Sequence, residues 1–252
     1  MSVDWSAVAA SVEHRPWPAP ERSWVMTMSW MHLLFAHWRV SAETIAAALP
    51  AELEVDTFDG EAWLGVVPFM MDNVTGRLLP NVPGVSRFPE LNVRTYVTAG
   101  GEKPGVWFFS LDADQRLAVW GARTFFDLPY VKADMACEVE DDGWVRYRSV
   151  RTDDRMAPGT FEGRYRGVGE PYRAAPGSLE AWLTERYCLY AADETGRVRR
   201  GDIVHEPWPL RRAEAELTCN TVADAHGLSC VGEPLLHVVD RIDVVGWTLE
   251  DL

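Results

Sequence analysis

Four polar side chains with different chemistry recur at every second position of one short segment, residues 88–97. They are Glu90, Asn92, Arg94 and Tyr96, and apolar or β-branched residues stand between them. An alternation of period two predicts a β-strand that carries the four polar groups on one face. Since buried polar groups need partners, an inward-facing row of this kind is either a closed structural network or the lining of a polar pocket.

Three interpretations of this row remain open at the level of sequence. In the first, Arg94 contacts Glu90 within a satisfied network that stabilises the sheet. In the second, the row lines a ligand pocket in which Arg94 binds a carboxylate, because a guanidinium matches a carboxylate better than an ammonium does. In the third, Glu90 is a general acid or base whose pKa is set by burial.

The elements that must position this row are mostly strands. Turn and alternation signals predict strands over residues 24–40, 54–58, 62–71, 88–97, 105–112, 133–139, 144–151, 160–168, 189–191, from 198 onward and 237–247. Ser41 and Ser178 are good N-caps for helices over 42–49 and 178–187, and 117–126 and 211–217 are further helical candidates. Short connections between strands favour antiparallel pairing. We therefore expect a β-rich α+β fold, a curved sheet or barrel with a few packed helices.

Composition narrows the class of protein. The 252 residues, without a linker-like segment, predict a single domain over 1–252 in which 1–23 form an extended N-terminal arm. The formal net charge of −14 argues against a duplex nucleic-acid partner, which requires a basic face. No apolar run is long enough for a membrane span, the first residues do not resemble a signal peptide, and four separated cysteines suggest a reduced, cytoplasmic protein.

Several motifs that would specify other chemistry are absent from the sequence. His32 and His37 are five residues apart, which is not a known metal-binding spacing, and there is no H-E-x-x-H. Neither a G-x-S-x-G elbow nor a glycine-rich nucleotide-binding loop occurs. The sequence therefore predicts no metal and no cofactor.

A set of short blocks resembles a known family when the blocks are taken in order. They are LLFAHW (33–38), LP (49–50), DTFDG (56–60), Trp63, VPF (67–69), 88–97, 105–112, AR (122–123) and LPY (128–130). In this order they resemble the YqjF-like family of uncharacterised bacterial proteins, which is similar in fold to acetoacetate decarboxylase. That resemblance implies a β-rich cone or double barrel with flanking helices and an internal cavity.

The resemblance also implies where the catalytic lysine of the decarboxylase would fall. In that family a lysine that follows a proline forms a Schiff base with a ketone, which acts as the electron sink for decarboxylation. Here Tyr130 follows Pro129, and Lys132 lies two residues further along the same strand face. Glu90 matches one pocket carboxylate of the family, whereas the carboxylate of the preceding strand is lost near Gly65. Schiff-base chemistry through Lys132 is thus the less favoured alternative.

These observations together predict a pocket for a small carbonyl or carboxylate compound. Its lining is expected to contain Glu90, Asn92, Arg94, Tyr96 and Tyr130, with Arg123 assisting. One alternative is a lyase-like or aldolase-like enzyme in which Glu90 moves protons and Tyr130 donates a hydrogen bond to an oxyanion. Another is a non-catalytic structural or interaction protein. The expected partner is a small organic ligand rather than nucleic acid or membrane, and a homo-oligomer is compatible with the sequence.

Overall fold

The computed structural model describes residues 3–82, 84–115, 127–193 and 195–252. One thirteen-stranded sheet accounts for most of this part of the chain. Its strands are β1 (Met26–Val40), β2 (Glu54–Val55), β3 (Ala62–Gly76), β4 (Phe88–Ala99), β5 (Glu102–Ala113), β6 (Tyr130–Val139), β7 (Val145–Arg151), β8 (Thr160–Tyr172), β9 (Cys188–Ala192), β10 (Val198–His205), β11 (Leu210–Asn220), β12 (Leu235–Gly246) and β13 (Glu250–Asp251). The expected β-rich, curved-sheet fold is confirmed.

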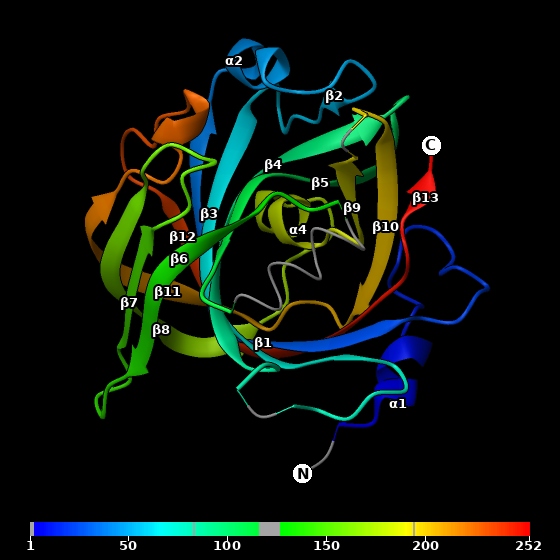
Figure 1. Ribbon diagram of the computed structural model, residues 1–252, viewed down its shortest axis with the longest axis horizontal. Helices are drawn as coiled ribbons and strands as arrows, with labels where there is room; N and C mark the ends of the chain where they lie inside the picture. Colours follow the sequence, from blue (N-terminus) through cyan, green and yellow to red (C-terminus); the bar gives the residue numbers. More distant parts are fainter. Residues whose placement is uncertain (1–2, 83, 116–126, 194) are drawn as a thin grey trace.

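The sheet closes on itself twice. In the first ring, β5, β6, β7, β8, β11, β12, β1, β3 and β4 follow one another, and β4 pairs back with β5. In the second ring, β10, β9, β5, β4, β3, β1 and β12 follow one another, and β12 pairs back with β10. Both rings therefore contain β1, β3, β4, β5 and β12, which we call the shared wall. In Figure 1, β7, β8 and β11 lie to the left of this wall, and β9 and β10 lie to its right.

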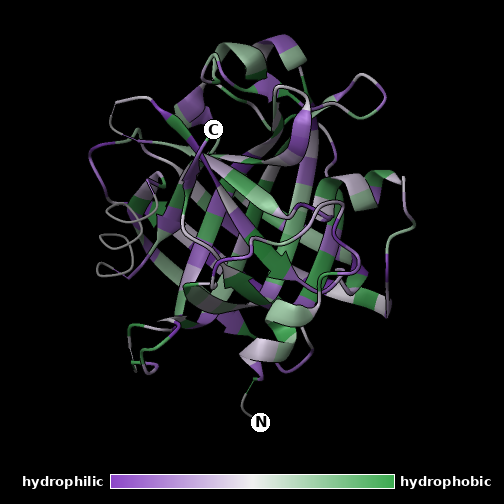
Figure 2. Ribbon diagram, turned by 90° about the vertical axis from the view of Figure 1, so that its right-hand side faces the viewer, coloured by the Kyte–Doolittle hydropathy of each residue, from purple (hydrophilic) through white to green (hydrophobic). Residues whose placement is uncertain are grey.

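Pairing is antiparallel almost throughout, as the short connections predict. Among the described strands, β5 pairs in parallel with β6 and with β9, and the remaining pairings are antiparallel. Figure 2 shows hydrophobic and hydrophilic residues alternating along the strands. In the central strand β4 of the shared wall, however, nearly every residue from Phe88 to Val97 is buried on both faces, because each face looks into a different ring.

Two irregularities decide which side chains of the shared wall enter which ring. In β1, the register against β3 shifts between Met31 and Ala36, and His32 has a positive φ of 51°. In β5, the register against β4 shifts opposite the step from Val93 to Arg94, which leaves Phe109 as an extra residue. A bulge of this kind inserts one residue and so exchanges the faces of the residues that follow.

Each ring has its own hydrophobic core. Leu91 and Val93 of β4 pack in the first ring with Tyr147 and Phe161. A second cluster, which includes Phe69, lies on the opposite side of the shared wall. The alternation that the sequence shows in β4 is therefore an alternation between two interiors rather than between core and solvent.

The helices are short and lie outside the strand framework or against the second ring. They are α1 (Trp5–Ala10), α2 (Ala42–Ala47), α4 (Leu179–Thr184) and the 3-10 helix η1 (Asp224–His226). The caps predicted for two of them are confirmed, since Ser41 accepts a hydrogen bond from the Thr44 amide and Ser178 from the Ala181 amide. No helix within the described ranges has the length and apolar character required to cross a bilayer.

Two predicted elements differ from the structure. Residues 211–217, predicted as helical, belong to strand β11, in which outward charged residues alternate with inward Ala213 and Ala215. Pairing with β8 aligns Glu214 and Glu216 with arginines of that strand, so tertiary context overrides the local helix propensity. The predicted extended arm contains the helix α1, and residues 11–25, between α1 and β1, have no helix or strand. The predicted helix over 117–126 lies outside the described residues.

Candidate functional site

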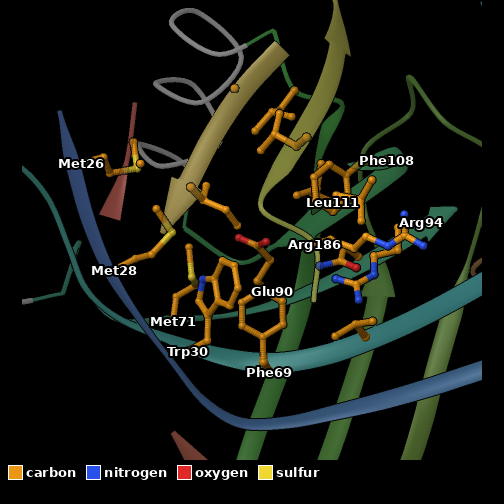
Figure 3. A pocket seen from close by; sticks show the side chains of 18 of the residues that line it. Met26, Met28, Trp30, Phe69, Met71, Glu90, Arg94, Phe108, Leu111 and Arg186 are labelled. Atoms are coloured by element: carbon orange, nitrogen blue, oxygen red, sulfur yellow. The ribbon is translucent and has the colours of Figure 1, made fainter. Parts of the chain in front are cut away.

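A cavity of about 290 Å³ lies inside the second ring, against the shared wall. Most of its lining is apolar and comes from β1, β3, β5 and β10. The polar lining residues are Glu90, Asn92, Arg94, Tyr130, Thr184, Arg186 and Asp202. Figure 3 shows the methionines of β1 and β3 on one side of this space and the two arginines on the other, with Glu90 between them. A mostly apolar cavity with a few convergent polar groups is typical of a small-molecule site.

Glu90 is a buried carboxyl group that favours its neutral form. Its side chain comes from β4 and accepts a hydrogen bond from the Tyr130 hydroxyl, with 2.7 Å between the oxygens. Burial raises the pKa of Glu90 to about 8, the Tyr130 hydrogen bond opposes this rise, and the nearby Asp112 carboxylate adds to it. At neutral pH, Glu90 is therefore mostly protonated, and its second oxygen, Oε1, makes no hydrogen bond to the described residues.

Arg94 and Asn92 present donors that no described residue uses. Arg94 is held by weak contacts of its Nη2, at 3.5 Å from both the Tyr96 hydroxyl and the Leu183 carbonyl oxygen. No hydrogen bond among the described residues involves Arg94 Nη1 or Asn92 Nδ2, and neither nitrogen is among the fully enclosed atoms. No ion pair within 4.0 Å joins Arg94 to Glu90 in the described part of the chain. The row is therefore not the closed network of the first interpretation.

Tyr96 lies behind Arg94 and does not line the cavity. Its hydroxyl is 2.6 Å from His37 Nε2, and burial together with the nearby Arg94 charge keeps the pKa of His37 well below its usual value. Gly65 of β3 pairs with Arg94 across the sheet, and a Cβ there would lie 3.2 Å from the His37 ring and 3.3 Å from Arg94 Cγ. The absence of a side chain at Gly65 thus leaves room for Arg94 and the His37 ring.

A second guanidinium, that of Arg186, lies at the same end of the cavity just after α4. It pairs with Asp56 and donates from Nε to the Trp182 carbonyl oxygen at 2.6 Å. Because burial outweighs the Asp56 interaction, the pKa of Arg186 is lowered. Its remaining nitrogen is buried without a partner among the described residues. Two of its three nitrogens thus have partners in the protein and the third is fully enclosed, so Arg94 is the better group for a ligand.

The N-terminal segment contacts Asp202 of β10, which lines the cavity. Arg15 Nη2 lies 2.6 Å from Asp202 Oδ1, and the Trp17 indole donates to the same oxygen at 2.9 Å. The Arg15 side chain is fully buried in this contact. The charge of the Asp202 carboxylate is therefore balanced by Arg15 on the side away from the cavity. The N-terminal segment thus helps to hold Asp202 in place.

Lys132 does not reach the cavity. Its ammonium group contacts Asp114 and donates to the Ala133 carbonyl oxygen at 2.9 Å. Tyr130 is the last cavity-lining residue of β6, because from Ala133 onward this strand pairs with β7 in the first ring. The shared strand face predicted for Tyr130 and Lys132 does not bring both into one pocket. Arg123 lies outside the described residues.

Sequence reasoning missed most of the apolar lining and the residues next to α4. Met28, Trp30 and Met71 were visible only as part of hydrophobic strands, and nothing marked Thr184 or Arg186. The useful signal was the density of methionine and tryptophan between residues 24 and 40. No group of three or more His, Cys, Asp or Glu side chains in the described ranges is arranged to hold a metal ion.

The β-rich curved sheet matches acetoacetate decarboxylase-like folds. Acetoacetate decarboxylase from Legionella pneumophila superposes with a TM-score of 0.64 at 14% identity, covering 94% of each chain. The enduracididine biosynthesis enzyme MppR in complex with pyruvate superposes with a TM-score of 0.62 at 13% identity, covering 95% of this chain and 93% of that one. At such identities the likeness concerns the fold alone.

Residues 27–243 match the model of the DUF2071 family, described as an uncharacterized conserved protein, and the chain belongs to this family. It is 48% identical over 231 residues to the uncharacterized protein YqjF of Bacillus subtilis (strain 168), covering 91% of this chain and 93% of that protein. The resemblance drawn from the sequence blocks is confirmed.

Proposed function

We propose that this protein binds a small organic acid in the cavity of the second ring, with the carboxylate on Arg94 and an adjacent carbonyl oxygen on Asn92. The observation that supports this most directly is the pair of unused donors, Arg94 Nη1 and Asn92 Nδ2, on one face of β4. A neutral Glu90 beside them adds no charge that would repel an anion. A guanidinium with a free nitrogen suits a carboxylate, and an amide nitrogen suits a carbonyl.

The similarity in fold gives this proposal a chemical context without fixing the ligand. Pyruvate, which MppR binds according to its structure's description, is a carboxylate with an adjacent carbonyl. The present chain has a tyrosine at the position that the resemblance assigns to the decarboxylase nucleophile, and its nearby lysine is engaged by Asp114. Binding therefore rests on hydrogen bonds and charge rather than on an iminium bond.

The test is a binding measurement with 2-oxohexanoate as the probe, by calorimetry and by quenching of the cavity tryptophans. Arg94→Gln removes a charge-assisted hydrogen bond, which is worth about 1.5–3 kcal/mol, so the Kd should rise roughly 10-fold to 100-fold. Arg212→Gln, on the exposed side of β11, is the matched control and should leave the Kd unchanged. If Arg94→Gln folds and binds 2-oxohexanoate like the parent, the assignment of the carboxylate to Arg94 is wrong.

A second candidate function is proton transfer at the carbon next to the ligand carbonyl. The specific observation is the Tyr130–Glu90 hydrogen bond together with a Glu90 pKa of about 8, which suits a general base that works near neutral pH. The ionised fraction of Glu90 would take a proton from C3 of the 2-oxo acid. The C3–H bond electrons would form the enolate, whose oxygen accepts a hydrogen bond from Asn92.

Exchange of the C3 protons of 2-oxohexanoate in D2O, followed by NMR, tests this candidate. The enzyme-dependent rate should rise with pH up to about 8 and then level off, since the base must be ionised. Glu90→Gln should abolish the exchange, whereas Lys132→Arg should preserve it. Exchange that persists in Glu90→Gln would exclude Glu90 as the base. The remaining alternative, a non-catalytic structural or interaction protein, is favoured if the parent neither binds the probe nor accelerates exchange.

A further inference from the structure

The cavity is larger than the smallest acid that its polar groups could hold. A volume of about 290 Å³ corresponds to roughly ten water molecules at ~30 Å³ each. A three-carbon keto acid has six non-hydrogen atoms and, at about one water volume per atom, fills roughly 180 Å³. About 110 Å³ then remains, which is space for several more carbon atoms.

The walls that remain beyond the polar groups are apolar and aromatic. Trp30 stacks on Trp208 with ring centroids 5.7 Å apart and an interplanar angle of 16°, and Phe69 meets Trp30 edge-on at 5.9 Å. Met28 and Met71 line the same end of the cavity (Figure 3). Methionine side chains are unbranched and adaptable, and their sulfur atoms make favourable contacts with aromatic rings.

The polar and apolar linings are segregated rather than mixed. Figure 3 shows Arg94 and Arg186 at one side of the cavity and Met26, Met28 and Met71 at the other, with Glu90 between them. An anion held at Arg94 would therefore direct the rest of the molecule past Glu90 toward the methionines. Leaving that end filled with water would expose an apolar surface with few hydrogen-bonding partners, which is unfavourable.

From this arrangement we infer that the ligand is an apolar-tailed keto acid whose tail beyond the carbonyl contains about five carbon atoms, because the remaining ~110 Å³ holds about four carbons beyond the methyl group of a three-carbon acid at ~30 Å³ each. This inference rests on the proposed function for its polar end, and the tail itself is derived from the volume and lining of the cavity. The tail packs against the wall that Met28, Trp30 and Met71 form, next to the Trp30–Trp208 stack.

The experiment is a homologous series of 2-oxo acids, from pyruvate to 2-oxodecanoate, with phenylpyruvate as an aryl member, titrated into the full-length protein. Each added CH2 that is buried should lower the Kd about fourfold. The Kd should therefore fall about 250-fold between pyruvate and 2-oxoheptanoate, which differ by four CH2 groups, and rise again at 2-oxodecanoate. An equal Kd for pyruvate and 2-oxoheptanoate would overturn the inference and leave the assignment of Arg94 intact.

Two variants locate the tail. Met71→Trp fills the apolar end and should move the tightest-binding acid to a shorter tail, whereas Met28→Ala enlarges it and should move the optimum to a longer tail. Met70→Trp is the matched control, because Met70 adjoins Met71 in β3 but does not line the cavity. If Met71→Trp does not fold, the Met28→Ala variant alone provides the test. If the tightest-binding acid in Met28→Ala has the same tail length as in the parent, the tail does not contact Met28 and the inference is wrong.

Failure of the polar assignment gives a different result from failure of the tail. If Arg94→Gln binds each acid as tightly as the parent and the Kd still falls about fourfold per CH2, the inference about the tail is supported and the proposed role of Arg94 is wrong. If the acids bind but unbranched alcohols of the same tail length bind equally well, the carboxylate is again not the recognised group. Absence of binding by every member of the series overturns both.

Discussion

The raised pKa of Glu90 makes the stability of this protein depend on pH, and the substitution Glu90→Gln separates the contribution of this one group. In the folded chain, burial raises this pKa from its ordinary value of 4.5 to about 8. The folded state therefore keeps a proton that the unfolded chain loses, and stability falls as pH rises from about 4.5 to about 8. Glu90→Gln cannot ionise, yet its amide oxygen can still accept the hydrogen bond from Tyr130.

The size of the effect follows from the two pKa values. One pKa unit corresponds to about 1.36 kcal/mol. Between pH 6 and pH 9, the parent should lose roughly 2–3 kcal/mol of unfolding free energy relative to Glu90→Gln, with little further loss above the folded pKa. Burial raises the pKa of Asp112 as well, to about 6, but this group is present in both proteins, and its contribution largely cancels in the difference.

Urea unfolding of both proteins at pH 6, 7, 8 and 9, followed by tryptophan fluorescence, measures this difference. Glu52→Gln, at an exposed position, is the control and should run parallel to the parent at every pH. If the difference between the parent and Glu90→Gln is constant from pH 6 to pH 9, Glu90 does not retain a proton in this range. The view of the site as a neutral acid beside a cation would then be refuted.

Three further predictions test other parts of the structure. Tyr130→Phe removes the hydrogen bond that opposes the rise in the Glu90 pKa, so the midpoint of the pH-dependent stability loss should move upward, which repetition of the urea series on this variant measures. Arg151→Met removes the ion-pair partner of the buried Asp112, whose carboxylate lies 2.9 Å from Arg151 Nε. Urea and thermal unfolding at pH 7 should show a loss of about 3–5 kcal/mol in the free energy of unfolding. A loss below about 1 kcal/mol would mean that this pair is not needed for stability. Borohydride trapping with pyruvate and 2-oxohexanoate should give no mass gain on the intact protein, and a gain that disappears in Lys132→Arg would restore the Schiff-base alternative.

The sequence is informative where local pattern and tertiary role coincide. Alternation in residues 88–97 predicts a strand with Glu90, Asn92 and Arg94 on one face, and these three side chains line the cavity together. Serine caps predict the starts of α2 and α4 because an N-cap is a local interaction. The blocks shared with the YqjF-like family supply the remainder of the fold.

Other features depend on contacts that a single sequence does not display. The bulge at His32 exchanges the faces of β1, so strict alternation would assign Phe35 to the wrong ring. Tyr96 follows the polar row in sequence, but α4 packs against its ring, and Trp182 lies 4.8 Å from it between ring centroids. Lys132 follows Tyr130 at strand spacing, but its ammonium group contacts Asp114 outside the cavity, and from Ala133 onward β6 pairs with β7. In each case the decisive neighbour is distant along the chain.

The shared wall has a consequence for how this protein can change over time. Along β4, adjacent residues such as Val93 and Arg94 point into different rings. Substitutions at even-numbered positions can therefore change ligand recognition, while the odd-numbered positions preserve the packing that keeps the molecule folded. A single residue inserted into β4 would exchange its two faces and place the guanidinium of Arg94 in the hydrophobic core of the first ring. During evolution, β4 should therefore tolerate substitutions on its cavity face, whereas insertions or deletions within this strand should rarely be tolerated.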